Sequence, residues 1–389
     1  MPNLKHYIPT FLERKMDHKT RHHLMKVLHF KTKYLNRSET FIDRLVRNHD
    51  RFQPVIATCE SIAYTDDLDV YEMPSSRLSG YLNILQLKLN MTPAFLFDVV
   101  RKEKPGIIHG HFGLDSYRLI RLKETFDLPL VVQFYGHDVS RLPQKFGWKL
   151  RYKRLFKHMD RAIAITDDMK KSLIRLGFDE DQISIIKLSV DVENIAFKHR
   201  TEAGPKLMMV GRCVEKKGFI YALKALKTIV ERRPSVSLDL YGDGELLPEL
   251  KSFVRKHGLS ESVNFHGFTA NDKVFEALYE HDILLVPSVQ AKDGDREGLP
   301  QTTVEGMATG IPVIASTHAG LPELVLDEET GLLVPTRDAE AISNAVHKLL
   351  DQPELASKIS WNGRRMVEQE HNVKNQVKQT EDLYNRLIS

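Results

Sequence analysis

The sequence predicts an α/β protein with two doubly wound parallel sheets in two domains that face a cleft. Compact, almost wholly apolar runs alternate with helix-period segments, which is typical of parallel strands buried on both faces. The alternation restarts behind the polar segment Thr201–Pro205, a natural linker. A chain of 389 residues is also longer than the roughly 100–200 residues of one domain.

The first half of the chain begins with a polar stretch, residues 1–24, which we interpret as an N-terminal extension. The first domain is expected over residues 25–200. Its expected strands are residues 26–30, 54–57, 106–109, 130–134 and 161–165, and a last apolar run at 183–188 closes it. Its expected helices are residues 40–46, 82–100, 117–125 and 167–176.

The second half repeats this alternation, and a second domain is expected over residues 206–370. Its expected strands are residues 206–211, 236–241, 263–265, 283–286 and 312–315. Its expected helices are residues 220–231, 247–257, 274–280 and 302–307. Residues 371–389 are predicted to form a C-terminal helix that packs back on the first domain. Ligands of doubly wound sheets bind at the carboxyl ends of the strands, so a site is expected there.

Composition places the chain among ordinary globular proteins, with 42% hydrophobic and 28% charged residues. Two cysteines are too few for a disulfide framework, and they favour a reducing compartment. Neither an apolar run of about 18 residues nor a secretory signal is visible, so a cytoplasmic protein is expected. Charge is uneven: residues 1–200 hold 34 Lys+Arg and 24 Asp+Glu, a net +10, whereas the remainder carries −6. This asymmetry predicts different partners for the two domains.

A glycine-bounded turn, Gly211–Gly218, follows one expected strand and precedes a helix. Backbone N–H groups and the positive end of a helix dipole bind anions at such turns. Arg212 and Lys217 add two cations. The turn matches neither a Walker loop nor a G-x-G-x-x-G fingerprint, and an ordinary turn with solvated charges remains the alternative.

Two carboxylates, Glu297 and Glu305, lie eight positions apart across a loop and the following helix. The expected helix start exposes N–H groups from Leu299 to Thr302, which suit a phosphate. Glu305 can accept hydrogen bonds from vicinal hydroxyls such as those of a ribose, and Glu297 from hydroxyls beyond the phosphate. The arrangement suits a nucleotide with a sugar on its pyrophosphate, and a helix with an acidic first turn remains the alternative.

Together these motifs resemble the family-4 retaining glycosyltransferases of the GT-B fold, which has two Rossmann-like domains. The resemblance is carried by Gly211–Gly218, Tyr241–Gly244, Glu297–Glu305, Gly310–Ala315 and Gly320–Glu323, in the order and spacing of the family. A narrower resemblance, to bacterial exopolysaccharide transferases such as those of colanic acid assembly, is carried by Ser38–Phe41, His109–Gly113 and Gly294–Glu297.

The resemblance implies a role for each matched residue. It assigns Arg212 and Lys217 to the donor pyrophosphate, Glu297 to the donor sugar and Glu305 to the ribose. Further donor-binding positions are Gly242, Gly298, Leu299, Pro300, His266, Gly267 and Phe268, the last three near the base. In the first domain, the resemblance makes His137 catalytic, facing the donor sugar, and places His109, His111 and Asp138 on the acceptor side.

The implied reaction is the transfer of a hexose, with retention of configuration, from UDP-glucose or a related UDP-sugar. The implied acceptor is a polysaccharide repeat unit or a lipid-linked saccharide. No cofactor, metal or nucleic acid is expected. A sugar-nucleotide epimerase or phosphorylase of the same fold and a non-enzymatic nucleotide-sugar sensor are the rival functions.

Some features depart from this pattern or allow other interpretations. The loop after the first strand, residues 31–37, lacks the usual glycine, and Ser38–Thr40 is expected to cap the next helix instead. Asp293 and Asp295 resemble a metal-binding Asp-x-Asp, which we discount because cations and a helix start replace that ion in this fold. His109 and His111 make a weak zinc site, since no third ligand is evident, and a structural or acceptor-binding role is favoured instead.

A basic stretch, residues 145–161, holds seven Lys and Arg and one acid, and Phe146, Trp148, Tyr152, Leu155 and Phe156 are interleaved with them. Such a helix can lie on an anionic membrane. The alternative is an amphipathic helix packed on its own domain, and for the helix alone we favour it. Because the first domain is basic and the implied acceptor is lipid-linked, we still expect peripheral contact with the inner face of the plasma membrane.

Overall fold

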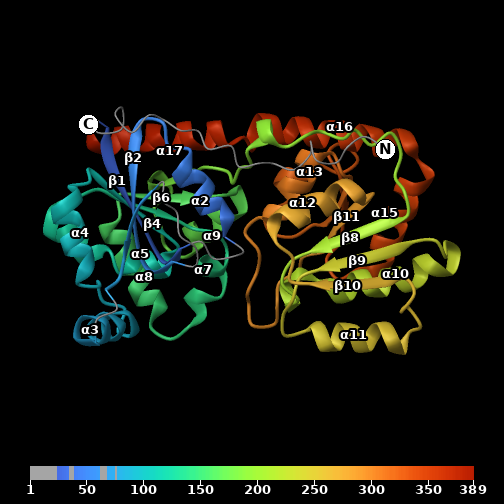
Figure 1. The fold of residues 1–389 in the computed structure, drawn as a ribbon, viewed down its shortest axis with the longest axis horizontal. Coiled ribbons are helices and arrows are strands. Elements are labelled where there is room, and N and C mark those ends of the chain that lie inside the picture. The colour runs from blue at the N-terminus through green and yellow to red at the C-terminus, as the bar shows by residue number, and fades with distance from the viewer. Residues whose placement is uncertain (1–23, 35–38, 62–67, 75–76) are drawn as a thin grey trace. The chain divides into compact units, whose positions relative to one another are not determined.

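The computed structural model describes residues 24–34, 39–61, 68–74 and 77–389, which form two compact units (Figure 1). Among the described residues, one unit combines residues 24–188 with the C-terminal residues 373–389. The other unit comprises residues 189–372. The expected extension, apart from its last residue, and the expected Ser38 cap lie outside the described residues.

The N-terminal unit is built on a parallel seven-stranded sheet with the order β3-β2-β1-β4-β5-β6-β7. Its central strands are short runs of Val, Ile, Leu and Ala that are buried on both faces, as in other parallel sheets. The strands are β1 (Met25–Tyr34), β2 (Phe52–Ser61), β3 (Asp69–Glu72), β4 (Ile107–His111), β5 (Leu130–Gln133), β6 (Arg161–Ala164) and β7 (Ile183–Ile185).

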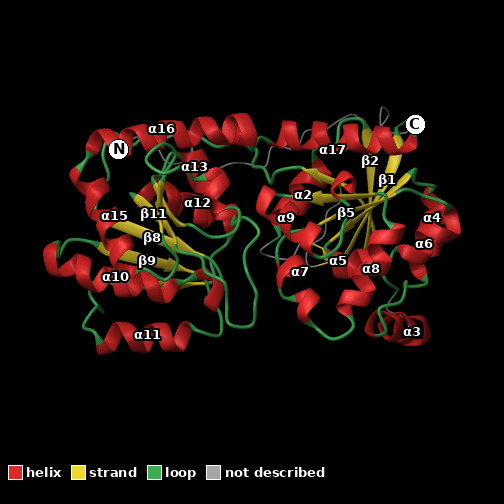
Figure 2. Cartoon of the chain, turned by 180° about the vertical axis from the view of Figure 1, so that it is seen from behind, coloured by secondary structure: helices red, strands yellow, loops and turns green. Residues whose placement is uncertain are grey.

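Helices cover both faces of this sheet (Figure 2). They are α2 (Thr40–Arg47), α3 (Arg77–Lys88), α4 (Phe95–Glu103), α5 (Gly113–Tyr117), α6 (Ile120–Phe126), α7 (His137–Ser140), α8 (Trp148–His158) and α9 (Asp167–Arg175). The last helix of the chain, α17 (Val373–Ile388), also belongs to this unit. Its Leu383 and Tyr384 pack in one apolar cluster with core residues of β1, β2 and β4 to β6.

The C-terminal unit is built on a parallel six-stranded sheet with the order β10-β9-β8-β11-β12-β13. Its strands are β8 (Lys206–Val210), β9 (Ser237–Tyr241), β10 (Val263–Gly267), β11 (Ile283–Val286), β12 (Val313–Ser316) and β13 (Leu332–Val334). Its helices are α10 (Phe219–Arg232), α11 (Leu247–Lys256), α12 (Asn271–Glu280), α13 (Gln301–Thr309), α14 (Leu321–Leu324), α15 (Ala339–Asp351) and α16 (Pro353–Glu370).

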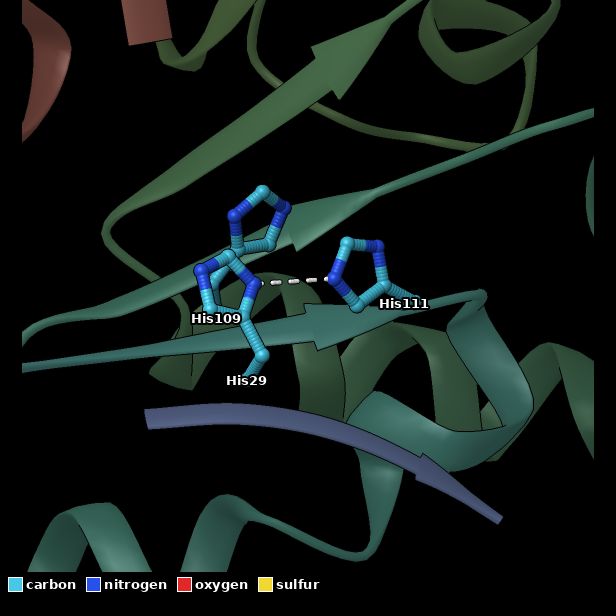
Figure 3. Close-up of side chains that lie close together, drawn as sticks. All are labelled: His29, His109 and His111. Carbon is cyan, nitrogen blue, oxygen red and sulfur yellow. Dashed lines mark hydrogen bonds between the residues drawn. The ribbon is translucent and has the colours of Figure 1, made fainter. Parts of the chain in front are cut away.

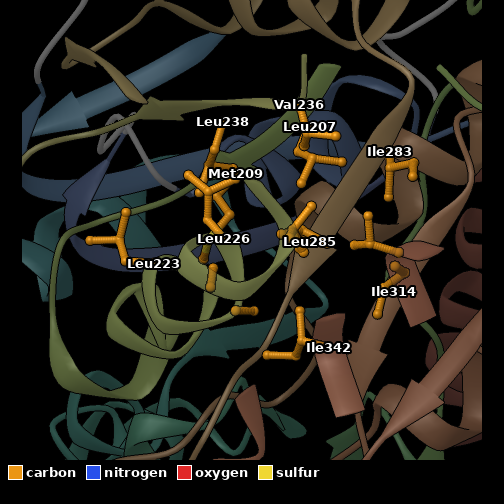
Figure 4. Close-up of a cluster of buried hydrophobic side chains, with 14 of the residues drawn as sticks. Leu207, Met209, Leu223, Leu226, Val236, Leu238, Ile283, Leu285, Ile314 and Ile342 are labelled. Carbon is orange, nitrogen blue, oxygen red and sulfur yellow. The ribbon is translucent and has the colours of Figure 1, made fainter. Parts of the chain in front are cut away.

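Its apolar core lies between the sheet and helices α10 and α15 (Figure 4). Leu207 and Met209 from β8, Leu285 from β11 and Leu226 from α10 are at most 2% exposed within it. Because α10 carries its buried residues three and four positions apart, one face of the helix supplies the whole contact. This packing supports the turn between β8 and α10.

Both sheets are doubly wound, as predicted, and each reverses its strand order beside its first strand, at β1/β4 and at β8/β11. Ligands of such sheets bind outside the carboxyl ends of the strands at this reversal. The sequence prediction missed the short strands β3 and β13 and ended β1 four residues early, at Phe30 instead of Tyr34. Within the described residues, no helix has both the length and the apolar composition needed to span a bilayer.

The chain enters the C-terminal unit at Ser189, earlier than the predicted domain end at residue 200. Residues 189–200, which lie between the two boundaries, contact the rest of the C-terminal unit through polar groups. The guanidinium of Arg200 donates to the carbonyl groups of Leu278, Tyr279 and His281. Arg364 donates to the carbonyl groups at 192 and 195 in the same way. Hydrogen bonds between an arginine side chain and carbonyl groups far away in the sequence produce no hydrophobic periodicity. The boundary at Ser189 could therefore not be predicted from the sequence.

Candidate donor site

The candidate site lies in the C-terminal unit, where β8, β9 and β10 end in glycine-containing turns. The N–H of Gly211 donates to the carbonyl of Tyr241 at 2.9 Å, and the N–H of Gly242 donates to that of Gly267 at 2.7 Å. Further along the same two turns, the N–H of Cys213, two residues after Gly211, donates to the carbonyl of Asp243 at 2.9 Å. These bonds bring the predicted donor-binding positions Gly242 and Gly267 beside the turn that carries Arg212.

Gly242 is required by a close approach of two backbones. Its φ is +142°, a conformation that L side chains rarely adopt. A Cβ atom there would lie 1.8 Å from the carbonyl oxygen of Gly211. Only glycine therefore allows the β9 turn to pack against the β8 turn.

Lys217 and Glu297, assigned above to the donor pyrophosphate and to the donor sugar, form an ion pair, with Lys217 Nζ 3.2 Å from Glu297 Oε1. Lys217 ends the single 3₁₀ turn Glu215–Lys217 before α10, and Glu297 lies in the long loop between β11 and α13. The preceding Lys216, which sequence reasoning missed, lies 3.7 Å from Glu297 Oε1 and 3.1 Å from Asp295 Oδ2. The loop is therefore attached to the turn by two cations and two carboxylates.

The electrostatics of this cluster keep Glu297 charged. Burial raises the pKa of this carboxyl, but the nearby cations Lys217, Lys216 and Arg212 outweigh burial and hold the pKa below its usual value. Arg212 itself is exposed, so its guanidinium is accessible to an anion. The turn thus places three cations, Arg212, Lys216 and Lys217, close together, and among them Arg212 is exposed to solvent.

Asp293 and Asp295, discounted above as a metal motif, make contacts within the loop and with the turn. Asp295 pairs with Lys216, and its N–H donates to the side chain of Asp293 at 3.0 Å. A neighbouring loop contact joins the N–H of Lys292 to Glu215 Oε2 at 2.9 Å. The signal for Lys216 was present in the sequence, because a second lysine adjoins Lys217, but the sequence did not show which lysine faces the loop.

The loop continues into α13 through Gly298, Leu299 and Pro300, which are all buried. Pro300 is the N-cap of α13, so the helix begins at Gln301, one residue before the expected start at residue 302. Glu305 lies one turn into α13 and is 2% exposed. The loop is also held from outside, because the N–H of Gly320 donates to the carbonyl of Gly298 at 3.2 Å.

Beside the glycine turns, two rings form a flat surface on β9 and β10. The rings of Tyr241 and His266 are stacked, with centroids 4.3 Å apart and planes 6° from parallel. His266 Nε2 lies 3.0 Å from Asp239 Oδ2, which fixes the orientation of the imidazole. Phe268 follows β10 with 55% of its surface exposed. Of the positions predicted to lie near the base, His266 and Phe268 therefore carry exposed rings, and Tyr241 stacks against His266.

The predicted residues of the N-terminal unit divide into one accessible and three buried side chains. His137 is half-buried at the first position of α7. Asp138 is 1% exposed and accepts hydrogen bonds from the N–H groups of Gly113, Tyr135 and Gly136. Its expected contact with an acceptor is corrected, because its carboxylate is occupied in fixing the turn before His137. Burial raises the pKa of Asp138, and these backbone hydrogen bonds oppose the shift.

His109 and His111 are 0% exposed, so the expectation that they face an acceptor is also corrected. A ring nitrogen of each histidine is hydrogen-bonded to another buried side chain of the N-terminal unit. Burial lowers the pKa of His109 to about 3 and that of His111 well below its ordinary value, so both imidazoles are neutral. Sequence reasoning also missed their neighbour His29 on β1, since 80 residues separate it from His109.

Comparison with known protein families identifies two matching domains. A model described as "Glycosyl transferases group 1" matches residues 191–366. A model described as "Glycosyltransferase Family 4" matches residues 38–194. The boundary between the two matches falls close to the boundary between the two structural units.

Among curated proteins, the chain is similar to the putative colanic acid biosynthesis glycosyltransferase WcaL of Escherichia coli. The two are 30% identical over 277 residues, which cover 69% of this chain and 68% of WcaL. The amylovoran biosynthesis glycosyltransferase AmsK of Erwinia amylovora is 29% identical over 281 residues, covering 71% of this chain and 69% of AmsK.

Solved structures establish the fold. HepE of Anabaena, in complex with UDP and glucose, superposes with a TM-score of 0.73 at 18% identity, covering 93% of this chain and 100% of HepE. The sucrose-phosphate synthase of Thermosynechococcus elongatus superposes with a TM-score of 0.76 at 19% identity, covering 93% of this chain and 99% of that enzyme. Both likenesses extend over nearly the whole chain, so the two-sheet GT-B architecture is shared.

Proposed function

We propose that this chain, which belongs to the group 1 and family 4 glycosyltransferases of the GT-B type, is a retaining hexosyltransferase of exopolysaccharide biosynthesis. The relatives WcaL and AmsK carry colanic acid and amylovoran biosynthesis in their names, which supports an exopolysaccharide acceptor. The HepE complexes with UDP, glucose and UDP-glucose support a UDP-hexose donor.

The observation that carries the proposal is the ion-pair cluster of Lys217, Lys216 and Glu297 beside the Gly211 turn. Cations placed before the reaction starts stabilise negative charge that develops on a departing diphosphate, and they need no reorganisation in the transition state. Lys217 and Arg212 supply this charge in the proposed mechanism. Glu297 holds Lys217 in position and accepts hydrogen bonds from the donor sugar.

The proposed transfer breaks the bond between the anomeric carbon and the diphosphate oxygen. A bond from the same carbon to the acceptor hydroxyl oxygen forms on the same face, which retains configuration. The acceptor proton passes to the departing phosphate oxygen. A carboxylate nucleophile, as in the paired acids of retaining hydrolases, is not required. We propose that no metal takes part in donor binding, which is supported by the pairing of Asp295 with Lys216.

If Glu305 binds the ribose, UDP affinity should depend on it. We expect UDP and the true UDP-sugar to raise the Tm of the wild-type protein, because a ligand of the folded state stabilises it by RT ln(1 + [L]/Kd). Glu305→Gln keeps the side-chain shape but removes the charge, and UDP affinity should fall about 10- to 100-fold, as for a lost hydrogen bond to a charged group.

Thermal-shift titration with a panel of nucleotide sugars measures this, with Glu340→Gln on the exposed side of α15 as the control. Unchanged UDP affinity in Glu305→Gln would place the ribose elsewhere. Conversion of the donor without an acceptor would indicate an epimerase, dependence on free phosphate a phosphorylase, and binding without any turnover a sensor.

We also propose that the N-terminal unit contacts an anionic membrane that carries the acceptor. In α8, Trp148, Tyr152, Leu155 and Phe156 are buried in the unit, as expected of an amphipathic helix packed on its own domain. The outer side exposes cations, among them Lys145, Lys149, Lys153, Arg154 and Lys157. Phe146 is fully exposed and Leu150 is 72% exposed among these cations. Apolar side chains within a basic surface suit anionic headgroups.

Vesicle sedimentation tests this surface. We expect the protein to pellet with vesicles that contain anionic phospholipid and to be released by salt. The double variant Lys149→Glu/Lys153→Glu should bind at least about tenfold more weakly, since each lysine near the surface contributes about 1 kcal/mol. The matched control, Lys251→Glu/Lys256→Glu, makes the same charge change on α11 of the C-terminal unit. Equal binding of both double variants, or no binding by the wild type, would disprove this surface.

A further inference from the structure

Three buried histidines meet inside the N-terminal unit, at the strand reversal between β1 and β4. The strand register pairs His29 with His109, and His111 lies two residues further along β4. Residues i and i+2 of a strand point to one face, as do directly paired residues of neighbouring strands. One ligand atom from each of the three imidazoles therefore lies within 4.8 Å of the others (Figure 3). All three side chains are at most 1% exposed.

Each histidine uses one ring nitrogen in a hydrogen bond that points away from the cluster. His29 Nε2 lies 3.0 Å from His49 Nε2. His109 Nδ1 lies 2.5 Å from the hydroxyl of Tyr384, and His111 Nδ1 lies 2.7 Å from that of Tyr135. These bonds leave His29 Nδ1, His109 Nε2 and His111 Nε2 to face one another.

Two of these inner nitrogens, His29 Nδ1 and His111 Nε2, are 3.0 Å apart. The third, His109 Nε2, is buried and makes no hydrogen bond of ordinary distance and angle among the described residues, although the side chain of Gln133 interacts with the His109 ring. A ring nitrogen without a partner is unfavourable in a dry interior. A tetrahedral zinc ion with Zn–N bonds of about 2.0–2.1 Å holds its ligand nitrogens roughly 3.3 Å apart. The His29 and His111 nitrogens have nearly this spacing already, and the His109 ring, whose ligand atom lies within 4.8 Å of the others, would move toward them on binding.

The surroundings of the cluster resemble the outer partners that orient metal-bound histidines. A ligating imidazole characteristically donates its other N–H to a carboxylate, a carbonyl or another polar group. Here His29 is followed by His49, whose Nδ1 lies 3.1 Å from Glu381 Oε1. Glu381 is 1% exposed and also accepts from the N–H groups of Asp50 and Arg51. The carboxylate of Glu381 is therefore connected to the outer nitrogen of His29 through His49.

We propose that His29, His109 and His111 bind one divalent transition-metal ion, best matched by zinc, as a structural site of the N-terminal unit. The amide oxygen of Gln133 is available as a fourth ligand. Gln133 pairs with His111 in the strand register, is 1% exposed, and its Oε1 has no hydrogen-bond partner among the described residues. The ion joins β1 to β4 and, through Tyr384, Glu381 and His49, to α17. It lies outside the donor site and takes no part in the transfer.

Metal content and cobalt spectroscopy test this site. Full-length protein from zinc-supplemented medium, freed of loose metal by gel filtration, should hold about one zinc per chain. Exchange for Co²⁺ during refolding should give the visible d–d bands of a low-symmetry site with nitrogen ligands. His109→Gln and His111→Gln should lose both signals. Tyr384→Phe, which removes only the outer partner of His109, should weaken metal binding about 10- to 100-fold.

His347→Gln is the control, because His347 is another buried histidine, 5% exposed, on α15 of the C-terminal unit. It should keep one zinc and the cobalt spectrum. A wild-type protein that holds no zinc and gives no cobalt bands would overturn the proposal and leave three neutral imidazoles, of which His29 and His111 are hydrogen-bonded to each other. Equal metal content in wild type and a folded His109→Gln variant would also overturn it. Should the histidine variants not fold, the wild-type measurements still decide.

Discussion

Lys217→Ala should lower kcat about 10²- to 10³-fold, while KM for the donor changes only a few-fold. The Nζ of Lys217 lies beside Glu297 at the turn before α10, where the proposed diphosphate departs. Loss of one preorganised group that stabilises developing charge typically raises the barrier by about 3–4 kcal/mol. Because the charge on the diphosphate grows as the bond breaks, the loss falls on the transition state more than on the bound donor.

Steady-state kinetics of Lys217→Ala with UDP-sugar and a saccharide acceptor measure this. Lys227→Ala removes the same charge from the exposed side of α10 and should leave kcat unchanged. A rise in KM with unchanged kcat would mean that Lys217 only binds the donor. Lys216 is a further comparison, since it holds Asp295 and Glu297 together and its loss should loosen the loop.

Much of this architecture follows from the sequence because parallel strands leave strong local signals. The compact apolar runs of β4, β5 and β8 were predicted as buried strands, and the structure has strands there. The order of the motifs predicted the second sheet and the position of Glu305 on a helix. Strands β3 and β13 were missed for a physical reason. They are four and three residues long at the sheet edges, and the burial of β3 is only partial, so no apolar run marks it.

The histidine cluster shows where single-sequence reasoning ends. His109 and His111 were visible as a pair, but their environment depends on the pairing of β1 with β4 and on α17, which are distant in sequence. Without knowledge of that pairing, nothing in the sequence distinguished His29 from the other histidines among the 17 of the chain. Of the structural and acceptor-binding roles open for the pair, burial favours the structural one, and burial by distant elements has no local signal in the sequence.

A second large effect is expected from Gly242→Ala, which should destabilise the C-terminal unit and disrupt the donor site together. The new Cβ would lie 1.8 Å from the carbonyl oxygen of Gly211 and 2.8 Å from its carbonyl carbon. Backbone atoms cannot rotate away as a side chain can, and the hydrogen bonds from Gly211 to Tyr241 and from Gly242 to Gly267 hold both turns. The positive φ adds strain for any residue with a Cβ.

Gly258→Ala separates the two causes of this loss. Gly258 also has a positive φ, +68°, but no atom lies within 4 Å of its would-be Cβ. It should lose only the conformational term, about 1–2 kcal/mol. Gly242→Ala should lose about 3 kcal/mol or more, which lowers Tm by at least roughly 6–12 °C in a unit of this size. Thermal unfolding of both variants measures the difference, and UDP titration of Gly242→Ala follows the donor site.

If both variants lost the same stability, the β8 and β9 turns would be able to separate. The close approach of Gly211 and Gly242 would then not be what holds the cation-bearing turn in place.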